Sequence, residues 1–494
     1  MIHHPARLSG ILRRAAGLLC LAALVSGCVQ TRLPVVGLRV PFPRNPLAET
    51  PPSMESNYSA LSWTEAFDAL HGRLVREYPF TEWKKISWDS LYDRFSLRMA
   101  DAEARDDAQA YYRALREYVH SVPDGYMGVS MDEARRMEAV GGGFGFSVVP
   151  LDDARLIVYR VAKNSGAAAA GITWGTQILE WNGKPAREAL EEVPTFWAQT
   201  PSPTYVGRLL DRCMLLTRGP VGGEAKISFK KPGDDRLWTV TLKAQNDQYL
   251  GMGDVVAYGR SFSELESPFE TRTLDGNIGY VNILSQSSTL TTPFPDRAYK
   301  KVMEKFVRDG VAGVVLDLRG NSGGDPRLAA AFAGHFMKEP RLIGDMVAFD
   351  PRKGGFSLAA DERIAIAPAK PYLDVPVVVL VHRSTRDTGQ VIAAALQGQP
   401  KVTVLGVLGT EGSLAKVGGE ARMPGGHVVH FPVGRVVDPQ GGVVITADAD
   451  LDGGVVPDVV LPANVELLDA QFNQGRDPVL DAALGLLRKQ AGGG

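Results

Sequence analysis

The sequence predicts a multi-domain α+β protein in which a helical part, a β-rich part and an α/β layered core follow one another. Apolar residues recur at helical spacing within residues 60–135, and short β-rich runs separated by glycines fill residues 138–247. Nearly all-apolar runs alternate with helical segments over residues 265–490. A chain of 494 residues also exceeds what one hydrophobic core usually supports, so several domains are expected.

The helical N-terminal domain, residues 60–135, is predicted from a capping signal and a buried stripe. Ser62-Trp63-Thr64-Glu65 has the form of a capping box, which marks the start of a helix. Apolar residues then recur on one helix face at Trp63, Phe67, Leu70 and Leu74. A second helix is expected around Leu91, Phe95 and Met99, and a third from about Asp106 to His120.

The last domain, residues 265–490, is expected to contain strands buried on both faces. Residues 278–283, 313–318 and 375–382 are nearly all apolar and rich in β-branched side chains, which is typical of a sheet covered by helices on both sides. Residues 298–308 and 328–337 have helical periodicity and are expected to cover that sheet.

The stretch Asp317-Leu318-Arg319-Gly320-Asn321-Ser322-Gly323-Gly324 follows one of these strands and precedes a helix that starts near Pro326. A glycine-rich loop at a helix N-terminus can present consecutive backbone N–H groups to an anion or an oxyanion. A tight strand-to-helix turn would explain two of the glycines without any function. The stretch alone does not decide between these interpretations.

Two regions carry a resemblance to known families. The run Gly141 to Val148, with residues 156–161, 164–172 and 175–184, resembles a PDZ domain of the bacterial, circularly permuted type, expected over residues 138–247. That resemblance implies a carboxylate-binding loop at Gly143, Phe144, Gly145 and Phe146, and a peptide C-terminus that adds to the domain as a strand. Ile178 and Leu179 would help to line the side-chain pocket. A PDZ domain that serves only as a lid or spacer is the alternative.

The order of the motifs behind this region resembles the carboxyl-terminal processing (tail-specific) protease family of serine peptidases. The matching segments are Ile278-Gly279-Tyr280, residues 317–324, the strand Val378 to Val381 and the helix Val391 to Gln397. Further matches are Trp88 to Tyr92, Asp124-Gly125, Gly454 to Asp458 and Asp477 to Leu480. The resemblance implies cleavage near polypeptide C-termini by a serine at the start of the helix, with oxyanion-stabilising amides at Gly323 and Gly324.

The sequence departs from the family pattern at the catalytic positions. Gln390 stands at the position of the family's helix-opening glutamate, which places Asp387 at the position of the nucleophilic serine. The position of the family lysine falls on Gly412, and Lys416 comes four residues too late. In tricorn-like relatives a histidine follows the Asp-Gly pair, but here Tyr126 does. The resemblance therefore identifies positions whose catalytic residue types are missing.

Three interpretations follow. The favoured one is a pseudoprotease that binds polypeptide C-termini or unfolded envelope proteins through its PDZ domain without cutting them, with Asp387 bound to the oxyanion loop. In the second, an active serine peptidase uses a displaced nucleophile, Ser384 or Thr385, with His382 nearby. In the third, Asp387 and Glu411 act as paired carboxylates in acid–base chemistry or hold a hard cation, although two solvated acids explain that pair more simply.

The N-terminus predicts export and a lipid anchor. Three arginines precede an apolar run of 11 residues, Ala15 to Val25, which is too short for a permanent membrane span and indicates a signal peptide at residues 1–27. Val25-Ser26-Gly27-Cys28 resembles a bacterial lipobox, so Cys28 is the expected lipidation site. Val29 in place of an aspartate favours the outer membrane, facing the periplasm. Ordinary cleavage, leaving a soluble secreted protein, is the alternative.

Residues 28–59 are proline-rich and predict an extended tether between the lipid and the folded body.

The composition excludes some other functions. The formal net charge is −2, and removing the signal peptide takes away three arginines and no acid, which leaves −5 and disfavours nucleic acid as a partner. Cys213 is the single cysteine after Cys28, so neither an internal disulfide nor a cysteine metal site is expected, and we expect no cofactor and no metal.

Overall fold

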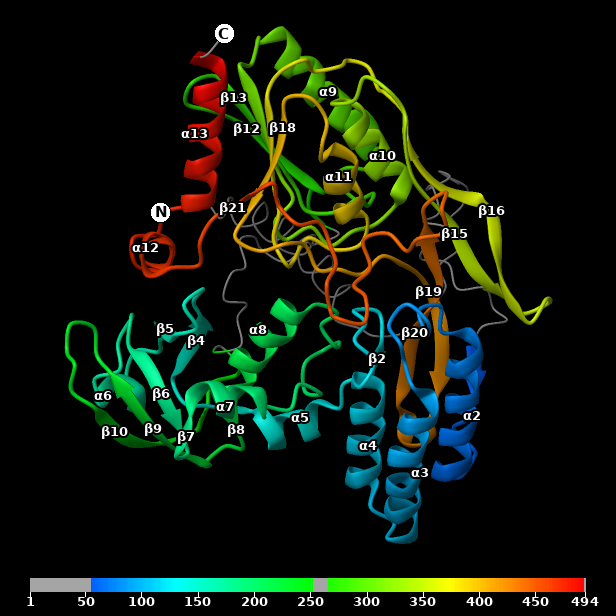
Figure 1. The fold of residues 1–494 in the computed structure, drawn as a ribbon, viewed down its shortest axis with the longest axis vertical. Helices are drawn as coiled ribbons and strands as arrows, with labels where there is room; N and C mark the ends of the chain where they lie inside the picture. The colour runs from blue at the N-terminus through cyan, green and yellow to red at the C-terminus, as the bar shows by residue number, and fades with distance from the viewer. Residues whose placement is uncertain (1–54, 250, 252–264, 493–494) are drawn as a thin grey trace, which may run out of the picture. The chain divides into compact units, whose positions relative to one another are not determined.

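The computed structural model describes residues 55–249, 251 and 265–492, all within one compact unit of mixed α+β structure (Figure 1). The signal peptide, Cys28 and the tether up to residue 54 lie outside the described residues. The end of the predicted tether needs a correction, because Glu55–Asn57 form a strand, β1, parallel to β19 (Ala415–Arg422). Order therefore begins before Ser62. Backbone pairing with β19 holds this strand in place, and such pairing produces no periodic pattern of apolar residues in the sequence.

The sheet core contains a six-stranded sheet in the order β12-β13-β14-β17-β18-β21. Its first pair is antiparallel and the other four pairs are parallel. The strands are β12 (Phe269–Leu274), β13 (Ile278–Ile283), β14 (Gly313–Asp317), β17 (Val377–Leu380), β18 (Val402–Gly406) and β21 (Val459–Val460). The helices are α9 (Pro295–Arg308), α10 (Pro326–Gly334), α11 (Thr388–Leu396), α12 (Val465–Leu468), with a π-helical turn at Asp469–Asn473, and α13 (Pro478–Gly492).

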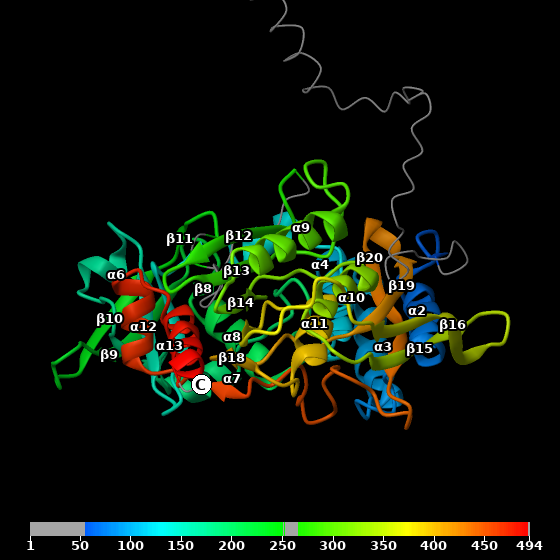
Figure 2. The ribbon, with the colours of Figure 1, turned by 90° about the horizontal axis from the view of Figure 1, so that it is seen from above.

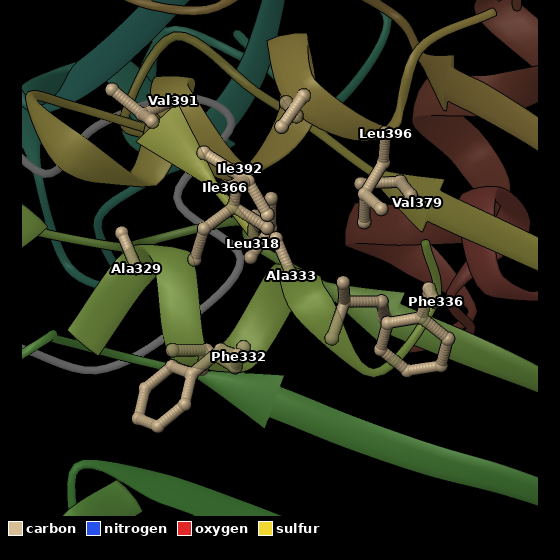
Figure 3. Close-up of a cluster of buried hydrophobic side chains, with 14 of the residues drawn as sticks. Leu318, Ala329, Phe332, Ala333, Phe336, Ile366, Val379, Val391, Ile392 and Leu396 are labelled. Carbon is tan, nitrogen blue, oxygen red and sulfur yellow. The ribbon is translucent and has the colours of Figure 1, made fainter. Parts of the chain in front are cut away.

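Helices cover both faces of this sheet, as the all-apolar runs predict. Successive side chains on a strand point to opposite faces, so Val314 and Leu316 pack with α9, α10 and α11, whereas Val315 packs with α13. Figure 2 shows α9 and α13 on opposite sides of the strands. Figure 3 shows part of the larger cluster, where Ile392 of α11 lies beside Ile366 and Leu318, and Leu396 lies beside Val379 of β17.

A second sheet joins strands of the N-terminal region to strands from residues 341–437. Its order is β1-β19-β20-β15-β16, and β2 also pairs with β20. The remaining strands are β2 (Gly128–Val129), β15 (Arg341–Asp350), β16 (Gly355–Ile366) and β20 (Val428–Val437), and a 3-10 turn at Pro424–Gly426 lies between β19 and β20. Residues of β19 and β20 in this sheet pack against the N-terminal helices.

The helical region (residues 63–140) begins where the sequence predicts. The Ser62 hydroxyl and the Glu65 side chain form the expected capping box, and Phe67, Leu70 and Leu74 are buried. The helices are α2 (Trp63–Glu77), α3 (Trp88–Ala104), α4 (Ala108–His120) and α5 (Glu133–Val140) (Figure 1). Their apolar cluster also contains residues of β19 and β20, such as Ala421 and Phe431, so the region shares its core with the second sheet.

The middle region (residues 142–246) is a β-rich unit with short helices. Its main sheet has the order β10-β9-β6-β5-β4, with β7 paired to β6, and a small sheet has the order β11-β3-β8. The strands are β3 (Gly142–Gly143), β4 (Phe146–Pro150), β5 (Leu156–Val161), β6 (Gln177–Trp181), β7 (Lys184–Pro185), β8 (Arg218–Gly219), β9 (Glu224–Lys230), β10 (Trp238–Lys243) and β11 (Gln245–Asn246). The helices are α6 (Gly166–Ala169), α7 (Ala186–Glu191) and α8 (Tyr205–Leu216). Cys213 on α8 is a buried free thiol.

Candidate active site

The candidate site lies where two neighbouring parallel strands end. β14 and β17 pair in register, and the glycine loop (residues 320–324) follows β14 while residues 381–387 follow β17 and lead into α11. The carboxyl ends of parallel strands meet at one edge of a sheet, where α/β proteins place their ligands. The two predicted motifs therefore meet at this edge.

The Asn321 side chain forms hydrogen bonds with backbone groups in and beside the glycine loop. Asn321 donates from Nδ2 to the carbonyl oxygen of Ile283 at 2.7 Å, and its Oδ1 accepts the Gly323 N–H at 2.9 Å. Arg319, just before the loop, pairs with Asp317 and Asp477, each at 2.7 Å. The loop is thus fixed to β13, β14 and the start of α13, and the Gly323 amide already has an acceptor.

Two glycines of the loop allow close approach to their neighbours. Gly323 has φ +85°, and a Cβ built there would lie 2.4 Å from the Cβ of Asp387. Gly324 has φ +142°, and a Cβ there would lie 2.5 Å from the carbonyl oxygen of Gln286. Only glycine fits both the backbone conformation and the space at these positions.

Asp387 occupies the N-cap position of α11 and turns its carboxylate to the glycine loop. Its Oδ2 accepts the Gly324 N–H at 3.2 Å, and its Oδ1 accepts the Tyr126 hydroxyl at 2.8 Å. Its backbone is unusual for a residue with a side chain, with φ +46° and ψ −125°. Such strain persists only where the surroundings impose it, and it concentrates at functional sites. Of the two predicted oxyanion amides, that of Gly324 therefore contacts Asp387, whereas that of Gly323 does not.

Burial changes the acidity of this carboxyl group. Removal from water raises the pKa of Asp387 to about 6, because burial outweighs the hydrogen bonds from Tyr126, Gly324 and Thr388, which favour the charged form. Burial raises the pKa of Tyr126 well above its usual value, and the carboxylates of Asp387 and Glu411 raise it further, so the phenol stays protonated and acts as the donor. The pair is a neutral phenol bound to a carboxylate that titrates near neutrality.

A further buried acid holds Tyr126 in place. Asp124 accepts the backbone N–H of Tyr126 at 2.9 Å and the hydroxyl of Tyr78 at 2.8 Å. Burial raises the pKa of Asp124, and Lys84 opposes that rise. Burial also raises the pKa of Glu411, Arg386 opposes the rise, and Asp124 adds to it. Three carboxyl groups thus share the surroundings of the Tyr126 ring.

The position of the family lysine is a glycine with its own constraints. Gly412 has φ +88°, and a Cβ there would lie 2.7 Å from the Cγ2 atom of Thr204. Gln390 holds this segment: its Oε1 accepts the Gly412 N–H at 2.8 Å and the Thr410 hydroxyl at 2.7 Å, and its Nε2 donates to the Ser413 carbonyl at 2.6 Å. The backbone at residue 412 therefore disfavours any side chain, a lysine included.

The two alternative nucleophiles lie at the other end of the glycine loop. The Ser384 Oγ accepts the Gly320 N–H at 3.1 Å and lies 2.9 Å from the Nδ1 of His382. Thr385 is fully buried, and its hydroxyl donates to the Leu318 carbonyl at 2.8 Å and accepts the His382 N–H at 3.1 Å. Ser384 thus has a histidine beside it but contacts Gly320 instead of Gly324, and Thr385 is engaged in the backbone of the turn.

The predicted carboxylate loop of the middle region is partly used in backbone pairing. Gly143 lies in β3 between β8 and β11, and the Phe144 N–H donates to the carbonyl oxygen of Thr217 at 3.2 Å. Gly145 has φ +86°, and its carbonyl accepts the Ala162 N–H at 2.8 Å. Phe146 begins β4, which is the edge strand of the main sheet. Ile178 and Leu179 line a cavity of about 450 Å³ near the far end of β4.

No group of three or more His, Cys, Asp or Glu side chains within residues 55–249, 251 and 265–492 is arranged to hold a metal ion. Asp387 and Glu411 accordingly have no third acidic or imidazole ligand in this part of the chain. Across the same residues, no helix is long and apolar enough to cross a membrane.

The structure joins two residues that the sequence identifies separately. Asp387 and Tyr126 were each recognised as a replacement of a family catalytic residue, and they form a direct hydrogen bond across 261 positions of sequence. Sequence reasoning missed the supports of this pair, Asp124 with Tyr78, and the use of the Gly323 amide by Asn321. The sequence signal for this support is the pair Asp124-Gly125, which matches a family motif.

Comparison with known proteins agrees with this architecture. Residues 277–461 match the model of Peptidase family S41. The chain is similar to the carboxy-terminal processing protease CtpA of Bacillus subtilis, with 24% identity over 64% of this chain and 59% of the relative. It is also similar to a carboxyl-terminal-processing protease of Picosynechococcus, with 23% identity over 65% of this chain and 66% of the relative. The chain thus spans less than two thirds of the length of either relative.

Solved structures show the same fold at low sequence identity. The structure of mature CPAF complexed with lactacystin aligns with a TM-score of 0.61 and 13% identity, covering 87% of this chain and 99% of that chain. Another structure of mature CPAF gives a TM-score of 0.61 and 14% identity, over 84% of this chain and 95% of that one. At this identity the likeness concerns the fold alone.

Proposed function

We propose, from the premise that residues 277–461 of this chain are a peptidase family S41 domain of the carboxy-terminal processing protease type, that the protein binds polypeptides without cleaving them. One observation carries this proposal. The residue at the position of the nucleophile is Asp387, and its carboxylate accepts hydrogen bonds from Gly324 and Tyr126. In this interpretation the carboxylate takes the place of the oxyanion that a serine attack would create.

The residues at the two family base positions support the same proposal. Acyl-enzyme chemistry needs a nucleophile with a base beside it, and removing the nucleophile leaves only weak acceleration. Gly412 stands at the lysine position in a left-handed conformation with Thr204 against it, and Tyr126 stands at the histidine position. A serine at residue 387 would therefore find no base at either family position.

The activity test compares the native protein with two variants. We expect the native protein to leave unfolded substrates with apolar C-termini intact over hours, as measured by mass spectrometry. We expect Asp387→Ser to restore no strong activity, because the base is missing. Cleavage by the native protein that disappears in Asp387→Asn would contradict the pseudoprotease interpretation.

The binding part of the proposal rests on the middle region, interpreted as a permuted PDZ domain. Its edge strand β4 follows Gly143 to Phe146, the order expected of a domain that adds a peptide as an extra strand. Because Gly143 and Phe144 are engaged in backbone pairing, the amides of Gly145 and Phe146 are the ones proposed to hold a peptide carboxylate. Polypeptide C-termini or unfolded envelope proteins are the proposed ligands.

Calorimetry with matched peptides tests this groove. A peptide with an apolar, free C-terminus is compared with its C-terminally amidated form on the full chain. We expect the amidated form to bind at least tenfold more weakly, because it lacks the carboxylate. Equal affinity for both peptides would remove the proposed role of Gly145 and Phe146.

An active serine peptidase is the second candidate, because the Ser384 Oγ lies 2.9 Å from the Nδ1 of His382. A serine–histidine pair is the minimum for an activated hydroxyl. Against it, Ser384 faces Gly320, at the opposite end of the loop from Gly324. Cleavage that survives Asp387→Asn but is lost in Ser384→Ala would establish this candidate in place of the first.

We also propose that the protein is lipid-anchored at Cys28 in the outer membrane and faces the periplasm. The support is the signal-like segment and the lipobox-like Val25-Ser26-Gly27-Cys28. Cys28→Ala is expected to move the protein from the membrane fraction to the soluble fraction of the envelope. An unchanged membrane fraction would argue against the anchor.

A further inference from the structure

A polar cavity lies on the helical region, remote in sequence from the glycine loop. Its volume is about 420 Å³, and α3, α4 and residues 194–196 line it. α3 contributes Arg94 and Arg98, one turn apart, while α4 contributes Arg113, Glu117 and His120 from one face. Two helices thus direct a group of cationic side chains to one hollow.

The positive charges of this cavity exceed the negative ones. Glu117 pairs with Arg98 at 2.6 Å and with Arg113 at 2.8 Å, so one carboxylate serves two guanidinium groups. Arg94 donates to the Ser121 hydroxyl at 2.7 Å, and no carboxylate pairs with it among the residues that the structure describes. Three arginines therefore face one acid, and the cavity retains an excess of two positive charges.

A buried histidine adds a donor that has no acceptor among the residues that the structure describes. The Nε2 of His120 lies 3.2 Å from an Nη atom of Arg116. A guanidinium can only donate, so Nε2 must be the acceptor and a neutral His120 carries its hydrogen on Nδ1. Burial and the charges of Arg116 and Arg208 hold the pKa of His120 well below its usual value, so the ring is neutral.

The Nδ1–H group of His120 is therefore a buried hydrogen-bond donor without an acceptor among the described residues. Nδ1 is buried without a hydrogen-bond partner in the described part of the chain, and only 6% of the His120 surface is exposed. A buried donor without an acceptor costs about 1–3 kcal/mol. His120 lines the cavity, so its neutral ring lies beside the space that the arginines face.

We propose that this cavity binds a doubly charged oxyanion, held by Arg94, Arg98 and Arg113 beside the neutral ring of His120. Guanidinium groups recognise carboxylate and phosphate oxygens through paired hydrogen bonds, and the excess charge matches a dianion. The site is independent of the glycine loop and of the function proposed above. Arg116 donates to the carbonyls of Phe196 and Ala198, so an anion here would also stabilise the link between α4 and the middle region.

Binding of two probes to the full chain tests the proposal. Inorganic phosphate and succinate are titrated separately by calorimetry at pH 7.5 and constant ionic strength, with chloride as the reference. We expect one or both to bind and to raise the melting temperature. Preference for phosphate indicates a phosphate-bearing ligand, and preference for succinate indicates an acidic polypeptide. Either result supports an anion site.

Matched arginine variants locate the site. Arg94→Gln is expected to weaken binding about tenfold, because it removes the guanidinium that has no carboxylate partner. Arg105→Gln, at the exposed end of α3 where Arg105 pairs with Asp101, is expected to leave binding unchanged. Failure of both probes to bind, or equal loss in the two variants, would overturn the proposal.

Discussion

The N–H groups at the two ends of the glycine loop donate to different kinds of acceptor, a carboxylate at Gly324 and a hydroxyl at Gly320. At the Gly324 end, an N–H donates to the carboxylate of Asp387, to which the half-buried phenol of Tyr126 also donates. At the Gly320 end, an N–H meets the neutral hydroxyl of Ser384, which has a histidine beside it. The end that corresponds to the family's oxyanion site thus holds a negative charge, whereas the end that holds a serine–histidine pair lacks the family's geometry. Nucleophile, base and oxyanion amides need to meet at one point, and here they are divided between two.

The largest expected effect comes from closing the space at the Gly324 end. Gly323→Ala would place a Cβ 2.4 Å from the Cβ of Asp387 on a backbone with φ +85°. We expect a loss of about 2–4 kcal/mol in the free energy of unfolding, measured by urea denaturation. The double variant with Asp387→Gly should recover part of that loss. Additive losses would show that the two residues are not in contact.

The pH dependence of stability distinguishes the charged end from the neutral end. The pKa of Asp387 is raised to about 6 in the folded protein, so between pH 4 and pH 6 the folded state binds more protons than the unfolded state. Stability therefore falls as the pH rises through this range, by about 1–3 kcal/mol for a partly exposed carboxyl group. Asp387→Asn removes this component. Identical pH profiles for the two proteins, from denaturation at pH 4 and pH 7, would contradict it.

Loss of the phenol should have a smaller effect. Tyr126→Phe removes the 2.8 Å hydrogen bond to the Asp387 carboxylate, and we expect a loss of about 1–2 kcal/mol at pH 7.5. The pKa of Asp387 should rise further, because the charged form loses a donor. Tyr92→Phe is the matched control, since Tyr92 donates to Asp68 at an exposed position and should contribute little. Equal effects of the two variants would mean that the half-buried Tyr126–Asp387 hydrogen bond stabilises the fold no more than an exposed one.

The smallest effect is expected at the Gly320 end. Ser384→Ala leaves the Gly320 N–H without its acceptor, and we expect a loss of about 0.5–1.5 kcal/mol with the pH profile of the native protein retained. A change in the Asp387 titration would show that the two ends are coupled. Denaturation of Ser384→Ala and of the native protein at pH 4 and pH 7 measures the stability loss and the pH profile.

Much of the fold follows from local patterns. The capping box at Ser62 begins α2 as predicted, and the all-apolar runs form strands buried on both faces because each face of the sheet is covered by helices. The likeness to the carboxy-terminal processing proteases, predicted from ordered motifs, is confirmed by the S41 match at residues 277–461. Strand β1 was missed, because three residues that pair with a strand far along the chain have no periodic signal.

The sequence by itself determined which residue types fill the catalytic positions, because the strand Val378 to Val381 and the helix from Val391 fix Asp387 between them. Tertiary structure decided what those residues contact: Tyr126 reaches Asp387 across 261 positions, and the Gly324 N–H reaches Asp387 across 63. Residue identity is local information, whereas a hydrogen bond depends on which distant segments the core brings together.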